Sequence, residues 1–558
     1  MTENAIYRLP ATLTEDLDNL RAMTSRFKAG SISAAEFRAF RVPLGVYEQR
    51  KEGAFMLRVR LPAGGVLPRQ MRTLAAVSKT YGNGILHVTT RQDIQVHEVT
   101  LDGIHPALVQ LADSGLCTKG GGGNTVRNIT ACCDAGVCAN EVFDVSPYAV
   151  ALTEFLMPDP LSYQLPRKYK IAFSGCTKDC AGATVNDLGC IAKRRGDKPG
   201  FAVYVGGGLG THSRIGRLLE PFVPADEIHV VAEAIKRVFD KHGNRKDRHT
   251  ARLRFLVEQI GFDRFRTLYE AESAALRESA RAKLQPRGLP SRTPCPTAPG
   301  TASTPEFEEW RKRNVLPQRQ NGYYRIQVSL FLGDIASDAL EKLSEVVERH
   351  GDGMARTTQE QNLVVRWVHE DELSLLHREL AEIGLALAAA TVLCNATACA
   401  GASTCRLGIC LSRGLVCAIR DRLIHDGLDL DRFRELRIRV SGCPNACGRH
   451  PVADIGLFGT ARRINGQLVP HYVLQLGGSV EEGATRLAQG KQAIPARSVP
   501  AVVAGFLRAY AQSPEYPNYG AFLEARGTAL AERLAAEHKQ TPSLDGSDVC
   551  RDWGAGVP

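Results

Sequence analysis

Hydrophobic and polar positions follow a regular order near the start of the chain. Residues 54–62 (AFMLRVRLP) alternate between apolar and polar side chains, as a half-buried strand does. Residues 69–79 have helical periodicity, residues 85–90 and 94–99 are typical of strands, and residues 106–113 are typical of a helix. The pattern predicts a small unit of mixed strands and helices, preceded by a mostly helical opening segment.

The same order returns after the middle of the chain. Residues 323–332 are a predicted strand, 335–350 a helix, 362–368 a strand and 371–383 a helix. Short polar motifs repeat with it, with small shifts in spacing: Thr89 and Thr90 with Gln92, then Thr357 and Thr358 with Glu360. Between the two patterns, residues 285–304 (QPRGLPSRTPCPTAPGTAST) are too rich in Pro, Ser, Thr and Gly to bury a core. We therefore expect a duplicated chain with an exposed linker.

Composition adds limits on the class of protein. A chain of 558 residues with 44% hydrophobic and 23% charged residues is typical of a globular protein with about three to four domains. The first twenty residues are polar and acidic, without the basic and apolar regions of an export signal. The best apolar run, residues 385–394, is far shorter than the ~18 residues of a membrane span. We expect a cytoplasmic protein with no membrane contact.

The net charge of +10 narrows the partners. It is compatible with a small anionic substrate, an acidic protein or nucleic acid. Nucleic acid is the least favoured of the three, because the chain has no dense Lys/Arg run and no aromatic–basic RNA-binding motif.

Eight of the sixteen cysteines form two sets with identical spacing. Each set reads C-x5-C, a gap and C-x3-C, and each member of the second set follows its counterpart by 267 positions (399 minus 132, and likewise for the other three). The first set is Cys132, Cys138, Cys176 and Cys180, and the second is Cys399, Cys405, Cys443 and Cys447. In a reducing compartment, cysteines in such a pattern favour metal binding over disulfides. Four thiolates from two short loops suit an iron–sulfur cluster.

Other metal sites fit this spacing less well. A zinc site is expected to have C-x2-C at both ends, and a bacterial ferredoxin to have C-x2-C-x2-C, and neither is present around the second set. Small residues between Cys399 and Cys405 allow backbone amides to approach cluster sulfides. Cys133, beside Cys132, is expected to be a bystander.

The second set lies in motifs that identify a family. The segments ACAGASTC and SGCPNACGRHPVADIGLFG resemble the cluster signature of the siroheme-dependent sulfite and nitrite reductases. The resemblance implies that Cys447 bridges a [4Fe–4S] cluster to the siroheme iron. It covers about residues 46–535 and implies an α+β fold with internal duplication. That fold has two ferredoxin-like half domains and two larger α/β domains for cluster and siroheme, related by a pseudo-twofold.

The expected domain boundaries follow from this resemblance and from the linker. They are a helical segment at 1–45, a first ferredoxin-like half domain at 46–115, a first siroheme and cluster domain at 116–284, a linker at 285–317, a second ferredoxin-like half domain at 318–385, a second siroheme and cluster domain at 386–540 and a tail at 541–558.

The family's substrate-binding cations fall in the first half. MLRVRLPAGG places one on Arg58, NTVRN one on Arg127, and LPRKYK two on Lys168 and Lys170. Strand alternation puts Lys168 and Lys170 on one face with Tyr169 on the other. Each cation alone is typical of a solvated surface, but four together favour a pocket that captures an oxyanion and supplies protons.

The second half does not repeat this quartet. An offset of 267 maps its members onto Arg325, Cys394, Glu435 and Arg437. Glu435 would repel an anion and Cys394 carries no fixed positive charge. We therefore expect a composite site, with cations from the first half over a haem bound to the second.

The first cysteine set has two interpretations. It holds a second [4Fe–4S] cluster, as an electron relay or within a silent haem site like the inactive centres of the dissimilatory branch, or it is a metal-free remnant. Intact spacing favours a cluster, since unused thiols invite oxidation. The resemblance also places siroheme carboxylates on the Thr89–Arg91 segment, best on Arg91, and on His97. His87 stands where some members have arginine.

The expected activity is six-electron reduction of sulfite to sulfide. Lys168-x-Lys170 favours sulfite, because nitrite-reducing relatives tend to carry asparagine at the second position. No flavin or nicotinamide signature is present, so electrons are expected from ferredoxin or a similar acidic protein. Three alternatives remain open: nitrite reduction to ammonia, a precorrin-3B synthase, and a haem-free electron carrier with two clusters.

Overall fold

The computed structural model describes residues 5–278, 283–291, 304–464, 466–538 and 550–555. Parts of the predicted linker and tail, residues 292–303 and 541–549, lie outside the described residues. The opening segment is helical, with α1 (Leu13–Lys28) and α2 (Ala34–Arg41). Helix α2 begins with a capping box between Ser33 and Glu36.

Two small five-stranded sheets carry the repeated pattern. The first has the order β1-β2-β5-β4-β13 and the second β11-β12-β15-β14-β3. The first copy contains β1 (Val46–Glu48), β2 (Phe55–Val59), β3 (Gly65–Val66), α3 (Pro68–Tyr81), β4 (Ile85–Val88), β5 (Ile94–Val99) and α4 (Ile104–Asp113). The second contains α9 (Pro305–Asn314), β11 (Val315–Pro317), β12 (Tyr323–Val328), β13 (Asp334–Ala336), α10 (Ser337–His350), β14 (Ala355–Thr357), β15 (Leu363–His369) and α11 (Leu373–Glu382).

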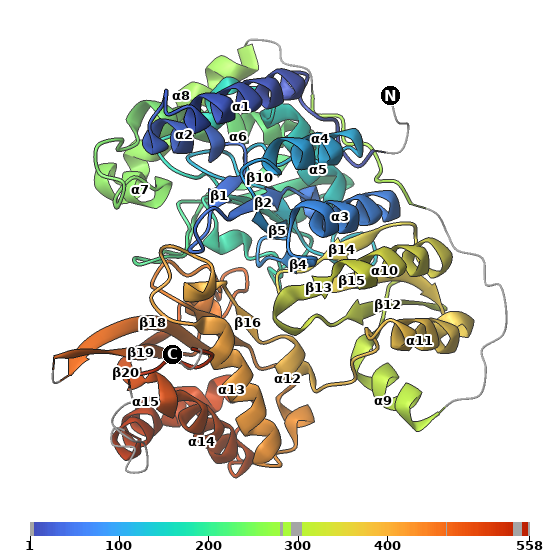
Figure 1. The fold of residues 1–558 in the computed structure, drawn as a ribbon, viewed down its shortest axis with the longest axis vertical. Coiled ribbons are helices and arrows are strands. Elements are labelled where there is room, and N and C mark those ends of the chain that lie inside the picture. The colour runs from blue at the N-terminus through green and yellow to red at the C-terminus, as the bar shows by residue number, and fades with distance from the viewer. Residues whose placement is uncertain (1–4, 279–282, 292–303, 465, 539–549, 556–558) are drawn as a thin grey trace.

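The two small sheets exchange their edge strands. Strand β13 of the second copy pairs with β4 of the first, and β3 of the first copy pairs with β14 of the second. Helices α3 and α10 pack side by side along the join, as Figure 1 shows. Arg72 of α3 makes a two-point ion pair with Glu348 of α10, at 2.9 and 3.0 Å. Neither half completes its small sheet without the other.

Each larger domain is built on a mixed sheet, with parallel strands at one edge. The first, ordered β10-β9-β8-β7-β6, contains β6 (Thr130–Ala131), α5 (Ser146–Leu156), β7 (Ile171–Ser174), β8 (Leu188–Arg195), β9 (Lys198–Val205), β10 (Arg217–Pro224), α6 (Ile228–His242), α7 (Leu253–Ile260) and α8 (Phe262–Glu278). The second, ordered β16-β17-β18-β19-β20, contains α12 (Thr391–Cys394), β16 (Thr397–Ala398), α13 (Ser412–His425), β17 (Ile438–Ser441), β18 (Ile455–Ile464), β19 (Gln467–Leu476), β20 (Gln489–Pro495), α14 (Val499–Ala511) and α15 (Tyr519–Glu537).

Hydrophobic packing divides the molecule unevenly. One core runs through the first larger domain and both ferredoxin-like units, and the second larger domain has a core of its own. In Figure 1 the second larger domain, coloured orange to red, lies below the rest. Among the described residues, no helix is both long and apolar enough to cross a membrane. The predicted duplicated α+β fold is confirmed.

The repeat has two offsets rather than one. Strand β6 and its counterpart β16 begin 267 residues apart, as the cysteines do (397 minus 130). Helices α4 and α11 begin 269 residues apart (373 minus 104), and so do β5 and β15 (363 minus 94). The first copy therefore has two extra residues between its small unit and its larger domain.

The strand exchange generates a prediction about stability. Gly64, just before β3, has φ of +75°, and a Cβ there would lie 2.7 Å from the Thr357 carbonyl oxygen of the other half. Gly53 has a similar φ of +69°, but a Cβ there would have no atom within 4 Å. Gly64→Ala should lower the free energy of unfolding by about 2–4 kcal/mol, because backbone strain and overpacking add.

Gly53→Ala is the matched control, and strain alone should cost it about 1 kcal/mol. Urea denaturation of both variants measures the difference. Equal losses of stability would show that the contact between the halves at Gly64 is unimportant.

Candidate active site

The four predicted substrate cations lie on neighbouring extended segments of the first half. Arg58 is on β2, Arg127 lies shortly before β6, and Lys168 and Lys170 directly precede β7. The Arg127 N–H donates to the Tyr169 carbonyl at 2.9 Å, which holds two of these segments side by side. Tyr169 is fully buried and both lysines are half-buried. Alternation thus places the two lysines on one face, opposite Tyr169.

One carbonyl brings the two arginines together. Arg58 and Arg127 both donate to the Gly121 carbonyl, at 3.0 and 3.1 Å. Arg58 also stacks on the ring of Tyr47, whose hydroxyl accepts from Arg127 at 3.5 Å and from the Gly123 N–H at 3.0 Å. Burial raises the pKa of Tyr47, but the charges of Arg127 and Arg58 outweigh it, so that the pKa is lowered. Tyr47 therefore positions both arginines, a role that no motif in the sequence indicated.

The glycine run at residues 120–123 allows this packing. A Cβ on Gly122 would lie 2.1 Å from the Val42 carbonyl oxygen and 2.7 Å from the Tyr47 ring. A larger residue would push Tyr47 away from the arginines. Close approach of the backbone is the reason for these glycines that the sequence favoured.

A buried carboxylate lies beside the arginines. Asp93 Oδ2 is 4.0 Å from Arg58 Nε. Burial raises the pKa of Asp93, although Arg58 and Arg91 oppose the shift. The region remains cationic, because one acid faces several fixed positive charges.

The two lysines have no neutralising partner. Among the described residues, no hydrogen-bond or ion-pair acceptor faces either ammonium group. Burial and the charge of Arg252 lower the pKa of Lys168 to about 7. Burial and the charge of Lys168 lower the pKa of Lys170 well below its usual value. A Cys447 thiolate opposes both shifts, so this second-half cysteine lies close to the first-half lysines.

Two direct contacts join the halves at this point. The Thr90 hydroxyl donates to the Cys447 carbonyl at 2.7 Å. At the related position of the second half, the Gln359 amide donates to the Ala181 carbonyl, beside Cys180, at 2.8 Å. Each half therefore touches the C-x3-C loop of the other.

A pair of aspartates explains why the first half alone leaves a lysine free. Asp187 accepts the Lys170 N–H at 2.9 Å and is neutralised by Arg252, whose Nη2 lies 2.9 and 2.8 Å from its two oxygens. Its counterpart, Asp454, accepts the Arg437 N–H at 2.9 Å and is neutralised by the Arg437 side chain itself, at 3.0 Å. Arg437 is thus spent on the aspartate, whereas Lys170 is not. The 267-residue spacing of the two aspartates was the available signal in the sequence.

The structure corrects one predicted counterpart. Arg58 pairs with Gln95 in its sheet, and Gln327 pairs with Val364 in the other, 269 residues later in both strands (327 minus 58). Gln327, rather than Arg325, is therefore the counterpart of Arg58. The single offset of 267 was wrong for this strand because of the two extra residues in the first copy. The second half thus lacks this cation as well.

Arg91 is used within the protein. Its guanidinium donates to the Asn186 side chain at 3.1 Å and to the carbonyls of Asn128 and Ile171 at 2.7 and 3.1 Å. Burial lowers the pKa of Arg91 to about 9. These contacts tie the loop between β4 and β5 to β7, while Arg91 Nε has no partner among the described residues.

The two histidines near this loop are neutral. His97 Nδ1 lies 3.1 Å from the Gln49 amide, and His87 Nδ1 lies 2.9 Å from Asp334. Burial lowers the pKa of His97 to about 3 and lowers that of His87 below its usual value. Neither histidine adds a positive charge near neutral pH.

The second cysteine set gathers at the carboxyl edge of two parallel strands. Cys399 follows β16 and Cys443 follows β17. The Gly442 N–H donates to Cys399 Sγ at 3.2 Å. Burial and Cys447 raise the pKa of Cys399 to about 12, and burial, Cys447 and Cys405 raise that of Cys443. These mutual effects show that the four thiols are neighbours.

The first set has the same placement. Cys132 follows β6 and Cys176 follows β7, also parallel neighbours. A hydrogen bond to Cys180 and burial raise the pKa of Cys176, and a hydrogen bond to Cys132 raises that of Cys180. Cys138 completes the set beside Cys176.

Both sets suit a [4Fe–4S] cluster in the number and type of ligand. Each offers four thiols from two loops, and the second also offers a backbone donor to sulfur. In the described part of the chain, no group of three or more Cys, His or acidic side chains is placed to hold a metal ion as the structure stands. The fit therefore rests on the thiols of each set and their shared origin at a sheet edge.

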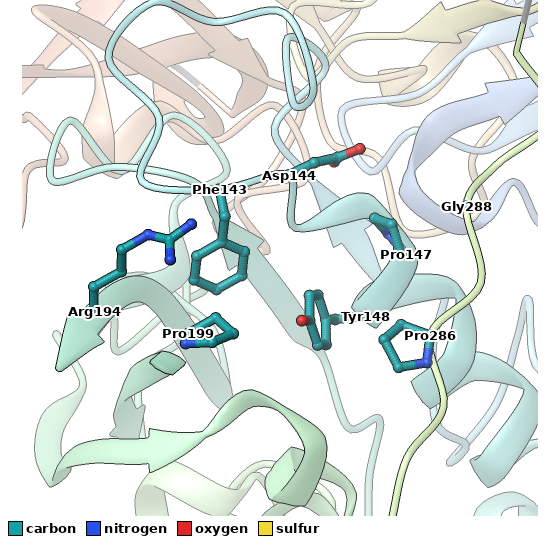
Figure 2. A pocket seen from close by; sticks show the side chains of 8 residues that line it. All are labelled: Phe143, Asp144, Pro147, Tyr148, Arg194, Pro199, Pro286 and Gly288. Atoms are coloured by element: carbon teal, nitrogen blue, oxygen red, sulfur yellow. The ribbon is translucent and has the colours of Figure 1, made fainter. Parts of the chain in front are cut away.

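A surface cavity lies away from the cations. It has a volume of about 340 Å³ and is lined by Phe143, Tyr148 and Arg194, with Pro286 and Gly288 beyond them (Figure 2). None of its lining residues is a predicted site residue. It borders the loop that follows Cys138 in the first half.

Comparison with known proteins agrees with this geometry. Residues 122–275 and 389–538, more than half of the chain, match the family described as the nitrite and sulphite reductase 4Fe-4S domain. Residues 47–113 and 316–383 match the nitrite/sulfite reductase ferredoxin-like half domain. The Mycobacterium tuberculosis NirA protein shares the fold, with a TM-score of 0.76 and 24% identity over 92% of this chain and 94% of that one.

Two curated relatives are similar over most of their length. The assimilatory ferredoxin-dependent nitrite reductase of Haloferax mediterranei is 31% identical over 487 residues, covering 84% of this chain and 81% of the relative. Sulfite reductase [ferredoxin] 1 of Mycolicibacterium paratuberculosis is 28% identical over 466 residues, covering 79% of each. The chain therefore belongs to the nitrite and sulfite reductase family of siroheme- and [4Fe–4S]-dependent oxidoreductases.

Proposed function

We propose that the protein reduces sulfite to sulfide at a siroheme coupled to a [4Fe–4S] cluster through Cys447. The observation that carries the proposal is the pair Lys168 and Lys170. Both are half-buried, both lack a protein acceptor in the described structure, and both lie close to Cys447. Unpaired cations are costly to bury unless an anion compensates them.

The bound cofactors supply six electrons, and the protein residues manage charge and protons. Arg58 and Arg127, held together on the Gly121 carbonyl, are placed to bind anionic oxygen atoms. Lys168 and Lys170 add positive charge and are proton donors. The lowered pKa of Lys168, about 7, suits repeated proton delivery near neutral pH, as each oxygen leaves as water.

Nitrite is the second candidate substrate. The relatives from Haloferax mediterranei and Synechococcus elongatus are named ferredoxin-dependent nitrite reductases, whereas the Mycolicibacterium paratuberculosis relative is named a sulfite reductase. Sulfite is favoured here because it carries up to two negative charges, and four cations attract a dianion more strongly than a monoanion. Sulfite reduction also fits the lysine at position 170.

An acidic protein is proposed as the electron donor. Several relatives are named for ferredoxin, and this chain carries a net charge of +10. Cys405 is exposed beside Arg406 and the exposed Leu407, which gives a donor access to the edge of the second cysteine set. We propose further that the first set holds a second [4Fe–4S] cluster.

Substrate preference is the first test. Steady-state assays with reduced methyl viologen should give a higher kcat/KM for sulfite than for nitrite. Lys170→Asn should lower kcat/KM for sulfite about tenfold or more, because one charge facing the dianion is lost, and lower that for nitrite less. Arg437→Asn, at the related position of the second half, is the matched control and should leave both values within about twofold. A wild-type preference for nitrite would contradict the proposal.

The pH dependence follows from Lys168. Its pKa is lowered to about 7, so the ammonium is protonated below that pH and neutral above it. Nitrite stays ionised in this range, so kcat/KM for nitrite should fall as pH rises, approaching about tenfold per unit well above pH 7. Lys168→Arg keeps its charge and should flatten the profile whatever its absolute rate. A wild-type profile that stays flat between about pH 6 and 9 would rule out this role.

The donor proposal predicts a dependence on salt. Electron transfer from a reduced ferredoxin should slow by about tenfold or more as ionic strength rises from about 0.01 to 0.3 M, because screening weakens attraction between opposite charges. Reduction by methyl viologen, a small cation, is the control and should not slow in this way. Stopped-flow rates measure both. Equal salt dependence for the two donors would count against an acidic partner.

A further inference from the structure

The space in front of Cys180 differs from the space in front of Cys447. The two cysteines are related by the repeat, so the residues around them are counterparts. Cys447 faces two unpaired lysines. Their counterparts near Cys180 are Glu435 and Arg437, and Arg437 is already paired with Asp454.

Ionic side chains surround Cys180. Asp134 makes a 3.2 Å ion pair with Arg325 from the second half. The electrostatic neighbours of Cys133 are Asp134, Arg325, Glu360 and Cys180, which places all of them together, and burial with the charge of Asp134 raises the pKa of Cys133. Charged groups from both halves thus meet at the first cysteine set.

A second ion pair extends this group. Glu360 lies 3.2 Å from Arg439, whose side chain is 4% exposed. Glu360 is also an electrostatic neighbour of Arg449, which is buried. The Arg449 guanidinium lies against Gly182, where an added Cβ would be 2.5 Å from Nη2. These side chains reach the residues next to Cys180.

The counterparts on the substrate side are small. The 267-residue offset relates Asp134 to Gly401, Cys133 to Ala400, Arg439 to Ala172 and Arg449 to Gly182. On the Cys447 side, these positions therefore leave room. On the Cys180 side, the same positions are filled by charged side chains, most of them in ion pairs, together with Cys133.

A tetrapyrrole on Cys180 would need to displace these groups. Its carboxylates would meet Asp134 and Glu360, and each displaced ion pair would leave a charge unpaired in a buried environment. The arginines that face this space are engaged with Asp134, Glu360 and Asp454, so they are not free to bind its carboxylates.

We infer that the first cysteine set holds a [4Fe–4S] cluster without a siroheme, so that the chain carries one siroheme, on Cys447. The inference rests on the proposed function for the presence of that cluster. The first centre then exchanges electrons only, because neither substrate cations nor a haem face it.

Cofactor content of the holoenzyme tests this inference. After anaerobic purification, iron, acid-labile sulfide and extracted siroheme are measured per chain. We expect about nine irons and one siroheme, from two clusters and one haem. About ten irons and two sirohemes would overturn the inference. About five irons with one siroheme would overturn the first cluster, and about eight irons without siroheme would instead overturn the proposed function.

Electron paramagnetic resonance gives an independent measure on a matched pair of variants. Cys180→Ser should change or abolish the signal of an isolated reduced cluster and leave the siroheme content and Soret band unchanged. Cys447→Ser, its counterpart, should alter the siroheme spectrum and its magnetic coupling to the second cluster. A Cys180→Ser protein that loses siroheme or shifts the Soret band while the second cluster is intact would overturn the inference. The cofactor content of the unaltered holoenzyme decides the matter if a variant does not fold.

Discussion

The exchange of two short strands between the halves constrains the rest of the structure. Strand β13 completes the first small sheet and β3 completes the second, so the two copies hold each other in a fixed relation. Hydrogen bonds reinforce the join: Thr357 Oγ1 donates to the Gln92 carbonyl at 2.9 Å, and the Gln92 amide donates to the Thr357 carbonyl at 2.8 Å. Because the loop that contains Gln92 also contains Thr90, the same join places the first half against Cys447.

Symmetry creates two equivalent places for chemistry, and side-chain charge distinguishes them. On one side, Arg252 neutralises Asp187 and leaves Lys170 free. On the other, Arg437 neutralises Asp454 and is consumed by that contact. The same fold thus offers a cationic, accommodating surface at Cys447 and a surface of paired charges at Cys180. Duplication of the cluster ligands does not require duplication of the substrate site.

The sequence predicted those features that repeat or alternate. The cysteine register, the strand and helix order, and the shared face of Lys168 and Lys170 follow from spacing and period alone. The strand exchange was not predictable, because β3 has two residues and its partner lies about 290 residues away. The counterpart of Arg58 was misplaced because two extra residues interrupt one constant offset. Tyr47 and Arg252 act through contacts that only the fold brings together.

A crystal structure of the anaerobic holoenzyme with sulfite bound is the most direct test of the composite site. We expect siroheme on the Cys447 side, with the anion held between it and Arg58, Arg127, Lys168 and Lys170. An anion bound on the Cys180 side, or one held by second-half cations with Lys168 and Lys170 turned to solvent, would contradict the composite site.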